Sequence, residues 1–378
     1  MAQWTGRYSG SHIGIAIVDI DDQEDGRNGV AYMFPDDAPS GASLAEFHIL
    51  DKLAKTRVKA VVHTLSPQHD FVPRERLPEL YPNLIFPATA DASLEWDRSR
   101  LKIEWTTEIG THGKATLSRR GGQKSKIKPK DEVTNWDQFK THILKLPPSQ
   151  FIFRGQSDPH RLVTRFHRTN RSNVLRFITE DIPALHRHLS ARTTHIFNLN
   201  NPTENGAFYN LVQHHGYPTP LLDWTYSPFV AAYFAYRYPS HDERGNVRIY
   251  MFDAKAWSSE WRQFQKLAPS MPHFSLLHFL PIENARSLPQ QAISSITNVE
   301  DIEAYLTSCE KAKKKTYLFA IDLPRVERAK VMHELRLMGI TAASLFPGLD
   351  GVCEDLRDRN FVEQIPATKP RPRAERVS

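Results

Sequence analysis

Three short clusters contain side chains that packing alone does not require, and the first points to anion binding. This cluster is Phe153-Arg154-Gly155-Gln156, in which an arginine follows a predicted apolar strand over 151–153. A guanidinium gives two parallel hydrogen bonds to an oxyanion, so Arg154 can hold a phosphate or a carboxylate. The alternative is structural, with Arg154 paired to Asp223 or Asp350 to fix the core.

The second cluster, residues 213–228, combines acidic, aromatic, hydroxyl and imidazole side chains around a predicted loop between helices. Asp223 either orients a turn or acts in a site, and its neighbours Trp224 and Thr225 favour the site. His214 adjoins a predicted helix end, where an imidazole either caps free carbonyl groups or transfers a proton.

The third cluster, Leu288-Pro289-Gln290-Gln291-Ala292-Ile293, places two amide side chains next to each other. Metal binding is not predicted for any of the three. Cys309 and Cys353 are the only cysteines of the chain, and no further ligands occur at a spacing typical of zinc.

Predicted strands and helices alternate around these clusters, which indicates an α+β domain. Apolar residues at 174, 178, 182, 185 and 189 share one helical face and predict a helix. Ser227-Pro228 predicts a helix start, because the hydroxyl accepts free N–H groups and proline suits the first position. The other predicted elements are helices over 207–212, 229–236 and 326–338, a strand over 247–252, and a last buried strand over 340–346.

The first part of the chain has the pattern of a small β-rich domain, which we place at residues 1–115. Isoleucines recur over 13–20, and an apolar run over 30–34 follows the turn dipeptide Asn28-Gly29. A hairpin is predicted over 101–118.

Positive charge concentrates in the second part. The formal net charge of +6 divides into −6 over residues 1–110 and +12 over 111–378. Residues 119–130 hold six positive charges and no negative one, which predicts a basic linker at 116–134, with contact to nucleic-acid phosphates as the alternative. The Pro- and Arg-rich end, 361–378, is predicted to be disordered.

The composition is that of a globular protein. The 378 residues suggest two domains, and 40% hydrophobic with 24% charged residues excludes a disordered or fibrous chain. Two cysteines, no leader-like start and no apolar run approaching about 18 residues predict a reducing, cytoplasmic setting without membrane contact.

Together these motifs resemble the FRG domain family, named for the Phe/Tyr-Arg-Gly motif present here at 153–155. The resemblance continues through Gln213-His214, Leu221-Leu222-Asp223-Trp224-Thr225, Ala231-Ala232-Tyr233-Phe234-Ala235, Gln290-Gln291 and Leu345-Phe346-Pro347-Gly348-Leu349-Asp350-Gly351. It assigns an FRG domain to 135–360 and leaves the N-terminal domain unassigned.

The FRG pattern is similar to that of ADP-ribosyltransferases, which implies a mixed α+β domain of that fold and NAD as substrate. On this analogy Arg154 holds the pyrophosphate or ribose of NAD, and Trp224 or Tyr233 stacks on the nicotinamide ring. The similarity assigns catalysis to Arg154, Asp223, Gln290 and Gln291, and NAD binding to Arg154, His214, Trp224, Thr225, Ser227 and Tyr233.

Gln290 or Gln291 would then replace the catalytic glutamate, which poses a chemical problem. Breaking the nicotinamide–ribose bond develops positive charge that a carboxylate stabilises. Two charges about 4 Å apart at an effective dielectric near 20 interact by about 4 kcal/mol, roughly a thousandfold in rate. An efficient enzyme therefore needs Glu283, Glu300 or Asp223 in that role.

Three functional hypotheses follow from the sequence. The first is an ADP-ribosyltransferase-like enzyme that modifies a protein or nucleic-acid acceptor or hydrolyses NAD. The second is a non-catalytic nucleotide- or nucleic-acid-binding module. The third, compatible with both, is a toxin or antiviral effector whose N-terminal domain recognises a partner. The sequence does not determine the oligomeric state.

Overall fold

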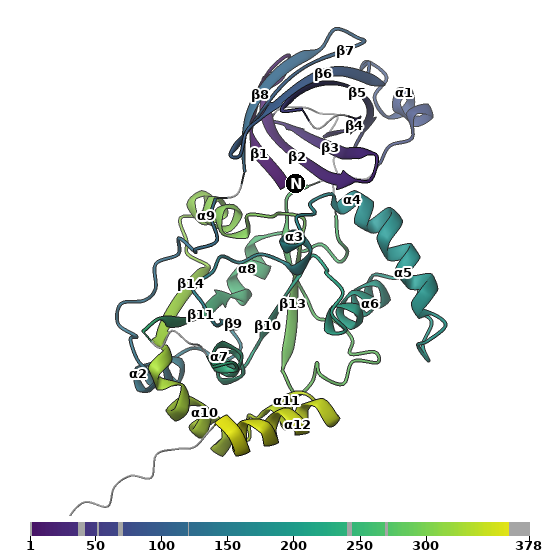
Figure 1. The fold of residues 1–378 in the computed structure, drawn as a ribbon. Helices are drawn as coiled ribbons and strands as arrows, with labels where there is room; N and C mark the ends of the chain where they lie inside the picture. The colour runs from purple at the N-terminus through teal and green to yellow at the C-terminus, as the bar shows by residue number, and fades with distance from the viewer. Residues whose placement is uncertain are drawn as a thin grey trace, which may run out of the picture.

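The computed structural model describes residues 2–36, 42–50, 53–66, 71–119, 121–239, 244–268 and 271–362, which form two domains (Figure 1). Residues up to 119 build an antiparallel β-barrel, and those from 121 onward build a mixed α+β domain around a second sheet. The predicted α+β class with a β-rich first domain is therefore confirmed. Residues 363–378 of the predicted tail lie outside the described part of the chain.

The barrel closes because eight strands pair in sequence order and the last returns to the first. The hairpin predicted over 101–118 is present as β7 and β8, and β8 pairs with β1, with Tyr8 opposite Ala115. A short helix, α1 (Leu77–Leu80), lies between β5 and β6. The strands are β1 (Ala2–Gly10), β2 (Gly14–Gln23), β3 (Gly26–Pro35), β4 (Ser43–Ile49), β5 (Lys55–Thr64), β6 (Thr89–Trp96), β7 (Arg100–Thr107) and β8 (His112–Arg119).

The first turn of this ribbon does not fall at Asn28-Gly29, where the sequence predicts it. Both residues lie inside β3, whose pairing with β2 starts at Gly26 opposite Gln23. A Cβ at Gly29 would lie 2.1 Å from the ring of Phe47. This glycine is explained by a close ring contact inside a strand rather than by a turn.

The second domain is built on one six-stranded sheet in which all neighbouring strands are antiparallel. Its two central strands, β9 and β10, pair at a single position, Thr225 opposite Phe153, and do not continue the ladder. The strand order is β12 (Phe274–Leu277), β13 (Ala292–Thr297), β10 (Leu221–Thr225), β9 (Phe151–Gln156), β11 (Asn246–Asp253) and β14 (Leu318–Pro324).

Helices cover both faces of this sheet, because its central strands are apolar on both sides. On one face Phe153 and Met251 pack against four helices: α2 (Trp136–Ile143), α7 (Pro228–Tyr236), α10 (Arg328–Leu337) and α11 (Ala342–Leu345). On the other face Ile152 and Phe252 pack against α8 (Ala254–Glu260) and α9 (Ile302–Lys313). The strand predicted over 247–252 and the helices predicted over 229–236 and 326–338 are confirmed.

Most of the remaining helices flank the sheet at its β10–β12 end, whereas the last one, α12, packs beside α11. The helix predicted over 174–189 is present as a continuous helical run that contains a π-helical segment, Phe177–Asp181. It packs against α6, which confirms the helix predicted over 207–212. No described helix is long and apolar enough to cross a membrane. The bounds are α3 (Arg165–Arg168), α4 (Val174–Arg176), α5 (Ile182–Leu189), α6 (Pro202–His214) and α12 (Leu349–Arg357).

The last buried strand predicted over 340–346 is wrong. The segment instead contains the short helix α11, which begins after Thr341. The Thr341 hydroxyl accepts from the backbone N–H of Ser344, and the Ser344 hydroxyl accepts from the Thr341 N–H. This reciprocal capping box stabilises a helical turn, and it outweighs the apolar character of the segment.

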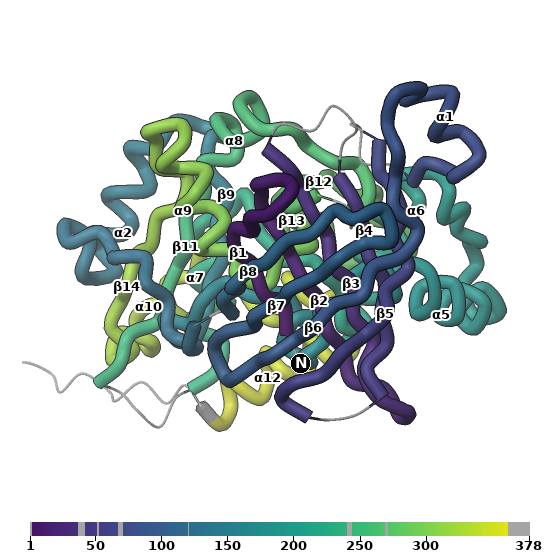
Figure 2. The backbone as a smooth tube through the Cα atoms, turned by 90° about the horizontal axis from the view of Figure 1, so that it is seen from above, coloured from purple at the N-terminus to yellow at the C-terminus, as the bar shows by residue number. Residues whose placement is uncertain are grey.

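Buried polar contacts attach the barrel to the second domain. The side-chain amide of Gln3 donates to the Asn298 carbonyl at 2.8 Å, and its carbonyl accepts from the Glu300 N–H at 2.9 Å. Asp21 is fully buried and accepts from the Ser172 N–H at 2.7 Å. Seen from above, the strands of the barrel lie over the second domain, while α2 and α5 extend past opposite sides (Figure 2).

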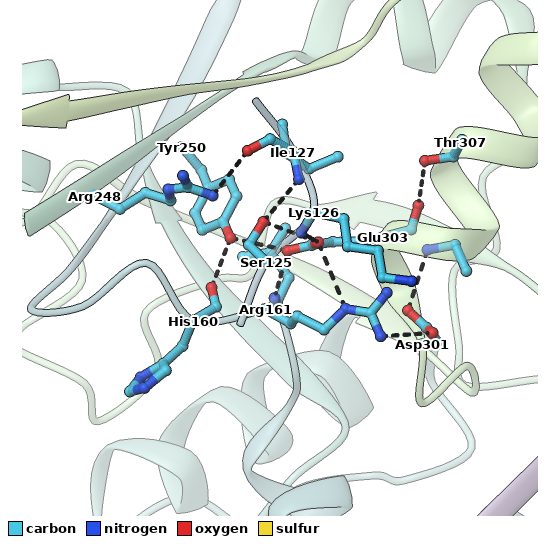
Figure 3. A network of polar contacts seen from close by, with 12 residues as sticks. Ser125, Lys126, Ile127, His160, Arg161, Arg248, Tyr250, Asp301, Glu303 and Thr307 are labelled. Atoms are coloured by element: carbon cyan, nitrogen blue, oxygen red, sulfur yellow. Dashed lines mark hydrogen bonds and ion pairs between the residues drawn. The ribbon is translucent and has the colours of Figure 1, made fainter. Parts of the chain in front are cut away.

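Beyond the end of β8, the described residues of the predicted basic linker are hydrogen-bonded to the second domain. β8 extends to Arg119, and beyond it the Ser125 hydroxyl donates to Glu303 at 3.0 Å (Figure 3). The Ile127 carbonyl accepts from Arg248 at 3.1 Å, and Tyr250 donates to Glu303 at 2.9 Å. The backbone is therefore fixed, and the exposed side chains of this segment include Lys124, Lys126 and Lys128.

Candidate ligand-binding site

A cavity of about 930 Å³ opens where β9 and β10 separate. Its walls come from these two strands, the segment around α3, the end of α6, α7 and the loop before β13. The site residues predicted from the sequence that line it are Arg154, His214, Asp223, Trp224, Thr225 and Gln290.

Arg154 bridges the gap between the two central strands. Its Nη1 donates to the backbone carbonyl of Asp223 at 2.7 Å, across the position where a strand ladder would otherwise continue. Its Nε is buried and has no hydrogen-bond partner among the described residues. A charged group with an unused donor marks a place for an acceptor, because an unsatisfied buried donor is costly.

The electrostatic surroundings of Arg154 show what kind of acceptor fits. Burial, opposed by the charge of Asp223, lowers the pKa of Arg154 to about 10, and the positive charges of Arg168 and Arg165 act in the same direction as burial. The guanidinium therefore stays charged at neutral pH. An anion placed beside it would relieve both the unsatisfied donor and the repulsion between like charges.

Gly155 places Arg154 by letting β9 lie directly against α7. A Cβ at this position would stand 1.8 Å from the carbonyl oxygen of Ala231 and 2.7 Å from the backbone nitrogen of Ala235. The neighbour on the other side, Phe153, is buried in the core that α7 shares with the sheet. The Phe-Arg-Gly motif thus combines a core anchor, a cavity-lining cation and a close backbone approach.

Asp223 is the one acidic residue among the described residues that line the cavity. Its Oδ1 accepts from the side-chain amide of Gln213, and the carbonyl of that amide accepts from the hydroxyl of Thr219. Gln213 and Thr219 are both buried. The carboxylate is therefore oriented by a short polar chain that reaches back into the core.

Arginines dominate the charge of the cavity wall. Arg161 pairs with Asp301 and Glu303, and Arg237 pairs with Glu354 through two hydrogen bonds. The described lining of the cavity contains six guanidinium groups and one carboxylate, that of Asp223, which makes the wall electropositive. The guanidinium groups belong to Arg154, Arg161, Arg165, Arg168, Arg237 and Arg286.

Phe346 lies between two of these cations. Its ring centroid is 4.1 Å from the guanidinium carbon of Arg237 and 5.6 Å from that of Arg286. Arg286 also donates to the carbonyl of His214 at 3.4 Å. Arg237, Arg286 and Phe346 are not predicted as site residues from the sequence, because they come from three distant segments without a shared motif.

Thr225 and Ser227 form the junction between β10 and α7. The Thr225 hydroxyl donates to the Gln290 carbonyl at 2.7 Å and accepts from the Ser227 N–H at 3.0 Å. The Ser227 hydroxyl accepts from the Val230 N–H at 3.2 Å and caps α7, as its sequence predicts. Both hydroxyl groups thus hold the cavity wall in place.

The two aromatic residues predicted to stack on a nicotinamide ring are both packed into the core. The Trp224 ring packs against Phe252 and Phe274, and its indole N–H donates to Ser295 at 2.9 Å. Tyr233 is 1% exposed and does not line the cavity. Both rings are therefore almost fully covered by protein, and of the two only Trp224 contributes to the cavity lining.

The two glutamines have different surroundings. Gln290 lines the cavity and is 8% exposed, and its amide donates to the Leu345 carbonyl at 3.0 Å. Gln291 has a φ of 47° in the turn before β13, is exposed, and does not line the cavity. Of the pair, Gln290 shares the cavity with Arg154.

The other two carboxylates considered for catalysis lie elsewhere. Glu300 accepts from the Gln3 N–H at 3.0 Å in the contact with the barrel. Glu283 accepts from the Thr194 hydroxyl at 2.6 Å. Only Asp223 of the three candidates faces the cavity. The described residues also contain no group of three or more His, Cys, Asp or Glu side chains able to hold a metal ion.

The fold and the site define a class: an α+β domain with an arginine-lined cavity where its two central strands separate. Residues 149–244 match the FRG domain family, so an FRG domain is present. The match runs from β9 past the end of α7 and includes Arg154, Gly155, Gln213 and Asp223. No protein in the curated set matches the chain.

Proposed function

We propose that the cavity of the FRG domain binds a nucleotide through its phosphates, and that NAD is its substrate. The observation that carries this proposal is the charged guanidinium of Arg154, whose buried Nε has no hydrogen-bond partner in the part of the chain that the structure describes and lies near Arg165 and Arg168. Guanidinium clusters match the geometry of phosphate oxygens.

The size of the cavity agrees with a ligand larger than a single phosphate. Small-molecule and cofactor sites span roughly 300–1,000 Å³, and the cavity of about 930 Å³ stands near the upper end of that range. A pyrophosphate beside Arg154 leaves room for a ribose and a base on either side. Besides Trp224, the cavity wall contains the aromatic side chains of Phe234, Tyr238 and Phe346, which would contact such a base.

The candidate reaction is cleavage of the nicotinamide–ribose bond, either by hydrolysis or by transfer of ADP-ribose to an acceptor. Asp223 supplies the carboxylate that the glutamine motif lacks, because it is the acidic residue among the described residues of the cavity wall and is oriented by Gln213. Its charge would stabilise positive charge that develops on the ribose. Gln290 is a hydrogen-bonding residue in this scheme rather than the catalytic group.

A non-catalytic nucleic-acid-binding module is the second candidate, and the docked basic segment favours it. Lys124, Lys126 and Lys128 are exposed on a backbone that hydrogen bonds hold in place, and the preceding Gln123 lines the cavity. A strand of nucleic acid could therefore contact these lysines and the arginines together. Binding of this kind weakens steeply with salt.

A role as a toxin or antiviral effector would follow from NAD consumption. In that case, expression of the wild-type chain in a bacterial host lowers cellular NAD and arrests growth. Expression of Arg154→Ala leaves both unchanged.

Purified protein incubated with labelled NAD and cell extract tests the enzymatic proposal. We expect nicotinamide release, with or without label transfer, from the wild type and from a surface control, Arg187→Ala. We expect neither from Arg154→Ala. Wild-type turnover no greater than that of Arg154→Ala removes the enzyme and leaves the binding module, which RNA and DNA titrations at two salt concentrations then test.

A further inference from the structure

The barrel contains a second cavity, of about 340 Å³, which is independent of the arginine-lined cavity. The interior of an eight-stranded barrel is either just filled by inward-facing side chains or holds one small ligand. Here many inward positions carry alanine, whose small side chain leaves space in the interior. The alanines that line this lumen in the described strands are Ala16, Ala31, Ala45, Ala60, Ala90, Ala92 and Ala115.

One end of the lumen is closed by large side chains. Trp4, Leu101 and Leu117 are buried there, each 4% exposed or less, in the same apolar cluster as the alanines. This end is the one that carries Gln3 and Asp21, which contact the second domain. A ligand therefore cannot enter from the side of the FRG domain.

At the opposite end, the described residues that line the lumen have the mixed chemistry of a binding-site mouth. Leu84 and Ile85 line it and are 43% and 80% exposed, although large apolar side chains are normally covered. Polar groups lie at the same end, where the Ser11 hydroxyl accepts from the His112 N–H at 3.0 Å. Among the described residues that line the lumen, none is Asp, Glu, Lys or Arg.

We propose that the lumen binds one medium-chain acyl or alkyl molecule, with its chain inside and its polar head at the mouth. The apolar wall disfavours burial of a charged group inside the lumen. The polar groups around Ser11 and His112 suit a small polar head group at the mouth. An apolar cavity of this kind stays dry and gains affinity from an apolar occupant.

The volume sets the chain length. At roughly 30 Å³ per non-hydrogen atom, the volume that one water molecule occupies in the liquid, about 340 Å³ accommodates on the order of ten such atoms. Each additional buried methylene should tighten binding about fourfold, the equivalent of about 0.8 kcal/mol. The gain should end once the lumen is full, near the length of decanoate or dodecanoate.

Calorimetric titration of the full-length protein with octanoate, decanoate, dodecanoate and hexadecanoate tests the proposal. We expect one site per chain, tighter binding from octanoate to decanoate, and no further gain from dodecanoate to hexadecanoate. No binding of any probe up to its solubility limit overturns the proposal. Affinity that keeps rising through hexadecanoate, or several sites per chain, also overturns it, because surface adsorption behaves in this way.

A pair of neighbouring substitutions locates the site. Ala115 faces the lumen and is 7% exposed, whereas Thr116 on the same strand is exposed on the outside. Ala115→Leu should weaken decanoate binding at least tenfold, and Thr116→Leu should leave it unchanged. If Ala115→Leu does not fold, as judged by circular dichroism, Ala60→Leu replaces it. Equal affinity in the wild type and in the folded lumen variant contradicts a site in the lumen.

Discussion

Replacing Asp223 by asparagine should separate binding from catalysis in the cavity. The exchange keeps the backbone carbonyl that accepts from Arg154 and a side-chain oxygen that can accept from Gln213, so the fold should be preserved. It removes the one acidic charge of the cavity wall among the described residues. At about 4 Å and an effective dielectric near 20, a carboxylate stabilises a developing positive charge by about 4 kcal/mol.

We therefore expect the kcat for NAD to fall about a thousandfold in Asp223→Asn. The affinity for ADP-ribose should be unchanged or higher, because a negative charge has left an electropositive cavity. Nicotinamide release and calorimetric titration measure the two quantities. Glu283→Gln is the matched control. The sequence makes Glu283 another candidate for the catalytic carboxylate, but this residue accepts a hydrogen bond from Thr194 and does not line the cavity. An unchanged kcat in Asp223→Asn would refute the catalytic role.

The remaining predictions concern stability. Gly155→Ala should destabilise the second domain by about 3 kcal/mol through its clash with Ala231, whereas Gly122→Ala, with open space around it, should not; thermal unfolding measures both. Burial raises the pKa of Asp19 well above its usual range, so its carboxyl favours folding at low pH and opposes it as pH rises. Asp19→Asn should accordingly raise Tm, and by more at pH 8 than at pH 4. Burial lowers the pKa of His273 to about 3. Below about pH 6.5, this histidine is therefore protonated in the unfolded chain but stays neutral in the folded protein. Stability should fall by about 2 kcal/mol between pH 7 and pH 5, and denaturant titrations of His273→Gln should show a smaller loss.

The sequence predicts most elements whose signals are local. The Ser227-Pro228 start, the mostly apolar run over 247–252 and the single-face spacing over 174–189 each depend on residues close together in the sequence. The segment 340–346 fails because its apolar content also suits a short helix, and a side-chain cap at Thr341 decides between the two. Closure of the barrel is not predictable in this way, since the pairing of β8 with β1 joins residues more than a hundred positions apart.

The same distinction applies to the site. Arg154 and Asp223 are recognisable because a charged residue at the edge of an apolar run needs a reason. The other arginines of the wall look like ordinary surface residues in the sequence, and only the fold brings them to one cavity. Trp224 illustrates the reverse case, because its aromatic ring suggested ligand stacking while the fold places it in the core.

Titration of ADP-ribose into the full-length protein at low and high salt is the most direct test of the central claim. We expect one site per chain whose affinity falls with salt, because phosphate contacts depend on ionic strength. Arg154→Gln should weaken it at least tenfold, the effect of losing a charged hydrogen bond, while Arg187→Gln should not change it. Absence of wild-type binding, or equal affinity in all three proteins, would contradict a nucleotide site at Arg154.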